Sequence, residues 1–290
     1  MTGVGRSSPR NGIPLGEHSR LGFLTLATVN RTFLYVPADR LEQLWPKAAN
    51  CGVDAVIADL EDGVAPSAKN DAREALARHL ATESAGPTLL VRIGAADDLD
   101  LLASRPDVMV VLPKADLSVI GAIEHRLGSR RVTALVESAT GLVDLLALAR
   151  HPAVDRLALG EADLRADLGL GEHADHALWP IRTQLVVASR AADIDPPVGP
   201  VATDWKDLES LRRTSVLLRA AGFGGRSAIH PDQVATIATV FRPSADEIAA
   251  ARRIVEIHET SIAAGTGVSV DDRGRMIDEA VVRSARRVLG

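Results

Sequence analysis

The chain has 290 residues, of which 46% are hydrophobic, 24% charged and only 3% aromatic. This composition is ordinary for a globular protein, and the length suits one large α/β domain. Small aliphatic residues dominate, which favours helices packed closely on a parallel sheet over an aromatic-rich sandwich. A net charge of −5 argues against nucleic acid or an anionic membrane as the main partner, although a local basic patch for phosphate stays compatible with it.

The single cysteine, Cys51, excludes an intramolecular disulfide framework and offers no cysteine-ligated zinc site. We expect a packed thiol there, because no base partner for a catalytic thiolate can be identified. No apolar run reaches the length of a membrane span. Residues 1–30 contain one short, poorly flanked apolar stretch, so we expect a mobile leader rather than a secretory signal, and a cytoplasmic protein.

Apolar, β-branched runs recur along the chain and are candidate strands. There are eight of them: residues 33–38, 54–61, 88–94, 108–115, 132–138, 154–163, 196–203 and 225–231. Between most of them alanine and leucine recur at three- and four-residue spacing, as in residues 67–81 and 140–150, which predicts helices. Such alternation indicates right-handed βαβ units and a parallel sheet.

Eight such units over about 200 residues predict a closed (β/α)8 TIM barrel, an α/β fold. An open doubly wound sheet is the alternative. It would normally have a glycine-rich phosphate turn after its first strand, whereas this strand ends in Val-Pro-Ala-Asp-Arg. We therefore favour the barrel.

A C-terminal helical extension follows the eighth strand. Ser244 and Glu247 form a capping-box pattern that predicts the start of a long helix, and a glycine- and aspartate-rich turn then precedes a basic amphipathic helix. Because a closed barrel has no further strand to cover, the extension must cap a barrel end, pack outside or reach a neighbouring subunit. The predicted organisation is a leader over residues 1–30, a barrel over 31–243 and this extension over 244–290.

Ionisable residues stand at most of the predicted strand ends. They are Asp39, Arg40, Asp59, Glu61, Asp62, Arg92, Lys114, Glu137, Glu161, Asp163 and His230. Each one alone is most simply a helix cap or a solvated group. Because the C-terminal ends of barrel strands converge on one mouth, the acids and the few cations together predict a divalent-metal site for an anionic substrate.

Glu137 and Asp163 follow consecutive strands, so their carboxylates can share one ion. Oxygen ligands without cysteine and with few histidines favour Mg²⁺, or Mn²⁺, over Zn²⁺. Arg92 can then offer its fork to an enolate or carboxylate oxygen. Lys114 can bind phosphate or pair with the acids of the second strand, and His230 is better explained as a structural residue than as a ligand.

The same strand ends carry motifs that resemble, in order, those of the citrate lyase β-subunit-like, or HpcH/HpaI, family of acyl-CoA lyases. The motifs lie at residues 31–40, 54–73, 89–94, 110–116, 134–142, 160–170, 228–234, 240–255 and 274–289. The resemblance implies a Mg²⁺-dependent (β/α)8 barrel, usually a homotrimer. Such an enzyme cleaves or forms a carbon–carbon bond between an acyl-CoA enolate and a carbonyl, as in malyl- or citramalyl-CoA lyases.

The resemblance also implies roles for single residues. Glu137 and Asp163 match the metal ligands, and Arg92 matches the arginine that holds the thioester or enolate oxygen. Asp278 matches an acid/base that closes over a neighbouring subunit's mouth, although on the sequence alone it is more simply a helix cap. The resulting assignment is catalysis by Arg92, Asp278, Glu61 and Asp59, substrate binding by Arg92, Glu137 and Lys114, and metal binding by Glu137 and Asp163, with Asp62 in the acidic cluster beside the metal.

The sequence departs from the family pattern at three positions. Gly94 stands where asparagine is frequent, Glu161 stands one place earlier than usual, and Arg226 replaces a common lysine. The departures leave the acyl group open. Two other functions stay open as well: a citryl lyase subunit that acts on an acyl carrier protein, and a non-catalytic acyl-CoA-binding regulator.

Overall fold

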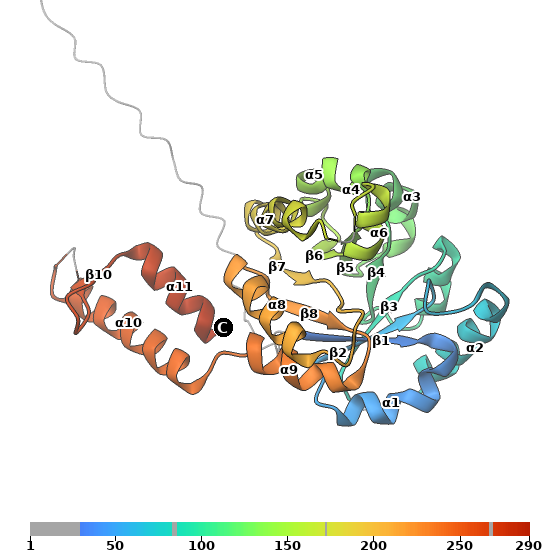
Figure 1. The fold of residues 1–290 in the computed structure, drawn as a ribbon, viewed down its shortest axis with the longest axis horizontal. Coiled ribbons are helices and arrows are strands. Elements are labelled where there is room, and N and C mark those ends of the chain that lie inside the picture. The colour runs from blue at the N-terminus through green and yellow to red at the C-terminus, as the bar shows by residue number, and fades with distance from the viewer. Residues whose placement is uncertain (1–29, 83–85, 172, 267–268) are drawn as a thin grey trace, which may run out of the picture.

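The computed structural model describes residues 30–82, 86–171, 173–266 and 269–290. Eight parallel strands close into a barrel in sequence order, with β8 pairing back to β1 (Figure 1). They are β1 (Thr32–Pro37), β2 (Ala55–Asp59), β3 (Thr88–Arg92), β4 (Met109–Leu112), β5 (Val132–Val136), β6 (Val154–Leu159), β7 (Asp195–Gly199) and β8 (Gly225–Ala228). All eight predicted strands are present, and the predicted (β/α)8 barrel is confirmed. Residues 1–29 lie outside the described residues, so the leader stays a prediction.

Helices surround the strands. They are α1 (Leu41–Asn50), α2 (Lys69–Leu80), α3 (Leu117–Leu127), α4 (Ala139–Val143), α5 (Leu145–Ala149), α6 (Glu161–Asp167), α7 (Asp175–Ala191), α8 (Leu208–Ala221) and α9 (Pro231–Phe241). The helix expected over 140–150 is divided into α4 and α5 at Asp144. The β3–β4 connection contains a 3₁₀ segment, Ala96–Leu102, in place of an α-helix.

The sixth strand ends earlier than predicted. It stops at Leu159, and Gly160 caps α6 with non-helical dihedral angles (φ −96°, ψ 79°). Glu161 and Asp163 therefore stand in the first turn of a helix and not on the strand. They still lie at the mouth of the barrel, because α6 starts directly from the strand's C-terminal end.

The core has two layers, as expected for a barrel. Inward-facing side chains fill the interior, including Phe33, Ile57, Leu90 and Leu135. A larger aliphatic cluster lies between the strands and the surrounding helices. Alternate residues along each strand belong to the two layers, which decides which strand-end side chains point into the mouth.

The C-terminal extension consists of α10 (Ala245–Ala263), a short antiparallel pair β9 (Ser269–Val270) and β10 (Met276–Ile277), and α11 (Glu279–Leu289). Ser244 Oγ accepts from the backbone N–H of Glu247 at 3.1 Å, and Glu247 Oε2 accepts from Ser244 N–H at 2.7 Å, so the predicted capping box is confirmed. Figure 1 shows α10 and α11 side by side, away from the barrel. None of the described helices is both long and apolar enough to cross a membrane.

Candidate active site

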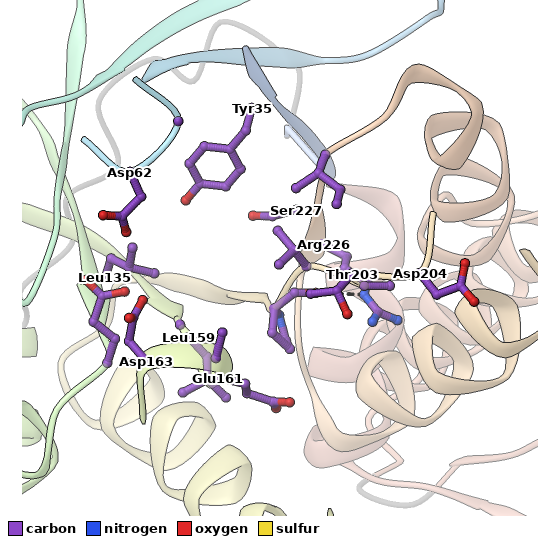
Figure 2. A pocket seen from close by; sticks show the side chains of 18 of the residues that line it. Tyr35, Asp62, Leu135, Leu159, Glu161, Asp163, Thr203, Asp204, Arg226 and Ser227 are labelled. Carbon is purple, nitrogen blue, oxygen red and sulfur yellow. Dashed lines mark hydrogen bonds between the residues drawn. The ribbon is translucent and has the colours of Figure 1, made fainter. Parts of the chain in front are cut away.

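A cavity of about 740 Å³ opens at the C-terminal ends of the barrel strands. Its wall includes Tyr35 from β1, residues that end or follow β2, β3, β5, β6 and β7, and parts of α6 and α8 (Figure 2). Asp59, Asp62, Arg92, Glu137 and Asp163 all lie in this wall. The structure thus brings five of the sequence-predicted site residues to one cavity.

Strand alternation explains why three of these side chains point inward. Asp59 stands two residues after the interior side chain of Ile57, and Arg92 and Glu137 stand two residues after Leu90 and Leu135. In a strand, residues two apart face the same side. The apolar filling of the barrel is therefore continued at the mouth by charged groups.

Arg92 is held by Asp59 in a buried, bidentate ion pair. Arg92 Nε donates to Asp59 Oδ1 at 2.7 Å and Nη2 donates to Oδ2 at 2.6 Å. Asp59 also accepts from the backbone N–H groups of Glu61 and Gly63, each at 2.8 Å. The guanidinium lies over the Tyr35 ring at 5.0 Å, and burial raises the pKa of that phenol. The oxygens of Asp59 are occupied by these bonds, so this carboxylate positions Arg92 and the loop that follows β2.

Glu61 joins the two cations at this side of the mouth. Arg92 Nη1 lies 3.0 Å from Glu61 Oε2, and Lys114 Nζ donates to Glu61 Oε1 at 2.9 Å. Of the two roles that the sequence left open for Lys114, the structure shows the pairing with an acid of the second strand. Asp62 is more exposed and lies 3.9 Å from Arg92.

Glu137 is buried and forms no ion pair with any residue that the structure describes. The residue is 3% exposed, and its Oε1 accepts from the backbone N–H of Lys114 at 2.7 Å. Lys114 has a positive φ of 48°, an uncommon conformation for a residue with a side chain, and it directs this N–H at the carboxylate. Burial, together with the negative charges of Glu61 and Asp163, raises the pKa of Glu137 to about 7, against the opposing effects of the Lys114 hydrogen bond and the charge of Arg92.

Asp163 and Glu161 stand on the same helical turn but differ in their partners. Arg182 holds Glu161 with two hydrogen bonds, from Nε at 2.6 Å and from Nη2 at 2.8 Å. Asp163 is exposed to the cavity and forms no hydrogen bond or ion pair with any residue that the structure describes. Of the two acids, only Asp163 has free oxygens.

Glu137 and Asp163 are therefore the pair that can hold a metal ion. Mg²⁺ keeps several waters and commonly binds proteins through one or two carboxylates, and a buried carboxylate with a raised pKa and an acidic neighbour favours a nearby cation. Within the described ranges, no group of three or more His, Cys, Asp or Glu residues is arranged for a metal. Zinc prefers a site with three or four protein ligands. A donor set of two carboxylates therefore fits Mg²⁺ better than Zn²⁺.

Asp278 does not reach this cavity. It is exposed, and its Oδ1 accepts from the backbone N–H of Val281 at 2.9 Å, so it caps α11 as the sequence alone suggested.

His230 caps α9 by accepting from the N–H of Asp232 at 3.2 Å, and it stacks on Trp205 at 4.0 Å. This placement agrees with the prediction that His230 is a structural residue and not a ligand.

Sequence reasoning missed three residues at the site. Tyr35 carried a usable signal, because it stands two residues after the inward-facing Phe33. Arg226, which lines the cavity from β8, was noted only as a departure from the family pattern. Arg182 carried no signal, since it lies within α7 and meets Glu161 only through tertiary packing.

The chain matches one family model and is similar to several known proteins. Residues 31–231 match the family model described as HpcH/HpaI aldolase/citrate lyase. The chain is 31% identical over 270 residues to a (3S)-malyl-CoA thioesterase of Cereibacter sphaeroides, covering 89% of this chain and 93% of that protein. It is 33% identical over 279 residues to a citrate lyase subunit beta-like protein of Mycobacterium tuberculosis, covering 92% and 97%.

A crystal structure of the protein CitE from M. tuberculosis, in complex with magnesium, acetoacetate and coenzyme A, is similar along most of the chain. Its TM-score is 0.74 at 32% identity, and the match covers 90% of this chain and 97% of that chain. The similarity therefore extends beyond the barrel residues that the family model matches.

Proposed function

The chain belongs to the HpcH/HpaI aldolase/citrate lyase family, and from this premise we propose that it is a Mg²⁺-dependent carbon–carbon lyase of 3-hydroxyacyl-CoA thioesters. The observation that carries the proposal is one arrangement at the barrel mouth. Two carboxylates that form no ion pair with any described residue, Glu137 and Asp163, share a cavity with the preorganised cation Arg92. Magnesium- and coenzyme-A-bound CitE supports the same reading.

Glu137 and Asp163 would hold the ion, whose bound form supplies a Lewis acid that lowers the pKa of a substrate hydroxyl. As the hydroxyl proton leaves to solvent, the oxygen's electron pair forms the carbonyl of the oxo product, the bond between carbons 2 and 3 breaks, and its electrons form the thioester enolate. Arg92 stabilises the enolate oxygen. Because Asp59 already holds its guanidinium in place, no reorganisation is needed as charge develops, and such preorganised donors contribute about 3–4 kcal/mol.

Asp278 would serve the mouth of a neighbouring subunit as the acid that protonates the enolate carbon. Two observations support this role: the side chain is exposed, and the extension that carries it lies away from its own barrel (Figure 1). We accordingly propose a homotrimer in which residues 244–290 reach the adjacent barrel formed by residues 31–243. A closed ring of this kind uses the same interface at every subunit.

The metal pair is tested by Glu137→Ala and Asp163→Ala, assayed with Mg²⁺ across a panel of 3-hydroxyacyl-CoA thioesters. We expect loss of cleavage in both variants, with the fold retained. Asp71→Ala is the control for Asp163, because Asp71 is an exposed acid in the first turn of α2, forms no hydrogen bond or ion pair with any described residue, and is not in the cavity wall. Full activity of either metal-pair variant would reject the assignment. Turnover only with a carrier-protein thioester would indicate the citryl lyase subunit, and binding of thioesters without turnover would indicate the regulator.

The role of Asp278 is tested by mixing two inactive variants, Glu137→Ala and Asp278→Ala, after dissociation and reassembly. If each site uses Asp278 from a neighbour, random mixing restores about a quarter of the sites. A mixture that stays inactive, while a wild-type sample taken through the same treatment recovers, would contradict the shared site.

A further inference from the structure

Arg226 is a buried cation that forms no ion pair with a carboxylate among the described residues. The residue is 4% exposed. Its Nε donates to the carbonyl of Pro200 at 2.8 Å, and its Nη1 donates to Leu211 O at 3.3 Å, Thr214 Oγ1 at 2.7 Å and Ser215 Oγ at 3.0 Å. All four acceptors are neutral. Nη2 has no acceptor within the part of the chain that the structure describes, so one end of the guanidinium keeps two free donors.

The other buried arginines show how unusual this is. Three of them have a carboxylate oxygen within 2.6 Å: Arg92 with Asp59, Arg156 with Asp195, and Arg182 with Glu161. Arg130 also bonds only to backbone carbonyls, but it precedes β5, at the end of the barrel away from the mouth, and is not in the cavity wall. Burying a charge without a partner costs several kcal/mol, so an unpaired arginine that lines a cavity indicates an anionic ligand.

The cavity wall reaches this arginine. We call the part of the wall formed by Glu161, Arg165, Thr203, Ser210, Thr214 and Arg226 the side arm; these residues come from α6, the β7–α8 connection, α8 and β8. Figure 2 shows Arg226 with Thr203 and Asp204 across the cavity from Asp62 and Asp163. The side arm therefore extends from α6, which also carries the proposed metal acid Asp163, to Arg226 on β8.

Apart from Asp163, the acids near the side arm are already engaged elsewhere. Both oxygens of Glu161 accept from Arg182. Asp207 Oδ1 accepts from the backbone N–H of Ser210 at 2.8 Å, and Asp204 Oδ1 accepts from that of Lys206 at 3.1 Å. No described acid lies within ion-pair distance of Arg226, so its charge is available to a ligand.

We propose that Arg226 binds the distal carboxylate of the substrate's oxo-acid half, so that the enzyme prefers 2-oxo dicarboxylic acids to 2-oxo monocarboxylic acids. The inference rests on the proposed lyase function, because that function places the oxo group near Asp163, at the start of the side arm. Burial lowers the pKa of Arg226 to about 10, so the guanidinium is still charged at neutral pH. Arginine also suits this task because its free Nη2 can donate to a carboxylate while Nε and Nη1 keep their existing partners.

The test compares acids of equal carbon number that differ in one terminal group. The full-length protein with Mg²⁺ is titrated calorimetrically with oxaloacetate against 2-oxobutanoate, and with 2-oxoglutarate against 2-oxopentanoate. We expect the diacid to bind at least about tenfold more tightly than its monoacid partner in one or both pairs, as a hydrogen bond between charged groups would give. No preference in either pair, or no binding of any of the four acids, would overturn the inference.

Two variants assign the preference to Arg226. Arg226→Gln should abolish the diacid preference and leave the monoacid affinity unchanged. Arg226→Lys, the milder change, should reduce the preference by at least about threefold, because one ammonium nitrogen must serve both the existing acceptors and the ligand, whereas arginine uses separate nitrogens. Arg130→Gln is the matched control, a buried arginine outside the cavity, and should keep the preference. An undiminished preference in whichever Arg226 variant folds would overturn the inference.

These outcomes are separable from those that bear on the lyase itself. Binding ratios report on the side arm, whereas Mg²⁺-dependent thioester cleavage reports on the proposed function. Cleavage without any diacid preference would reject only the role of Arg226. A diacid preference that depends on Arg226, in a protein without cleavage, would reject only the lyase.

Discussion

Two buried arginines lie over aromatic rings of the same strand at opposite ends of the barrel. Arg92 lies 5.0 Å from the centre of the Tyr35 ring, at the mouth, and Arg156 lies 5.3 Å from that of Phe33, at the other end. The two rings are two residues apart on β1 and so face the same interior. The residue types are thus almost the same at the two ends.

The surroundings of the two arginines differ. Arg156 pairs with the single acid Asp195 at 2.5 Å and donates to the backbone carbonyl of Asn30 at 3.1 Å, so the chain itself closes that end. Arg92 lies among three acids and faces a cavity of about 740 Å³. The same arginine–aromatic pair therefore seals one end of the barrel and presents a charge at the other. We expect stability to depend on the first end and catalysis on the second.

The largest expected effect comes from replacing each arginine by lysine. Arg92→Lys keeps a charge but loses the fork held by Asp59, and we expect kcat to fall about 10²- to 10³-fold. Arg156→Lys should leave kcat unchanged and lower the free energy of unfolding by about 1–3 kcal/mol, because one buried donor set is lost. Steady-state kinetics and urea unfolding measure the two quantities. Equal losses of activity in the two variants would contradict our expectation that catalysis depends on the Arg92 end of the barrel and stability on the Arg156 end.

Local patterns in the sequence were sufficient to predict the fold and part of the site. Strand alternation and the end of each apolar run place Asp59, Arg92 and Glu137 at one mouth, and Asp59 is the register neighbour of Arg92 on adjacent strands. Periodicity along the chain carries this information directly.

The ion-pair partners of the acids at the site were harder to predict. Glu161 and Asp163 look equivalent in the sequence, and they differ only because Arg182 on α7 reaches the first of them, 21 residues away. The side arm has the same origin, since Arg226 and the residues around it come from β8, α6 and α8. Such contacts depend on helix packing, which no short pattern encodes. The placement of α10 and α11 away from the barrel also follows from tertiary structure, which is why the sequence left three options open for this extension.

A methyl group added next to Glu137 should affect Mg²⁺ binding at the mouth of the barrel, and we expect an effect of intermediate size. A Cβ on Gly160 would overlap Glu137 Oε2 and come within 2.7 Å of Glu137 Cβ. Gly160→Ala should therefore displace the carboxylate and weaken Mg²⁺ binding about tenfold, or about 1.4 kcal/mol. Isothermal titration with MgCl₂ measures this change directly.

Gly121→Ala is the control for that substitution. Gly121 lies on α3 with no atom within 4 Å of an added Cβ, so alanine should stabilise the helix by about 0.5–1 kcal/mol and leave Mg²⁺ affinity unchanged. Unaltered Mg²⁺ affinity in Gly160→Ala would show that Glu137 is not a ligand or that its position is not critical.

The smallest expected effect is a pH dependence of stability at the end away from the mouth. His79 is buried against the Trp45 ring at 4.3 Å, its Nε2 has no hydrogen-bond partner among the described residues, and burial lowers its pKa. The unfolded chain binds a proton at this histidine below about pH 6.5, whereas the folded chain does so only at lower pH. The free energy of unfolding should therefore rise with pH from the lowered pKa up to about 6.5 and change little above it.

His79→Leu should flatten that slope, and the same change at exposed His125 is the control. Because His79 is remote from the mouth, its titration should leave kcat per folded molecule unaffected, and a parallel change in kcat would link the two ends that we distinguish.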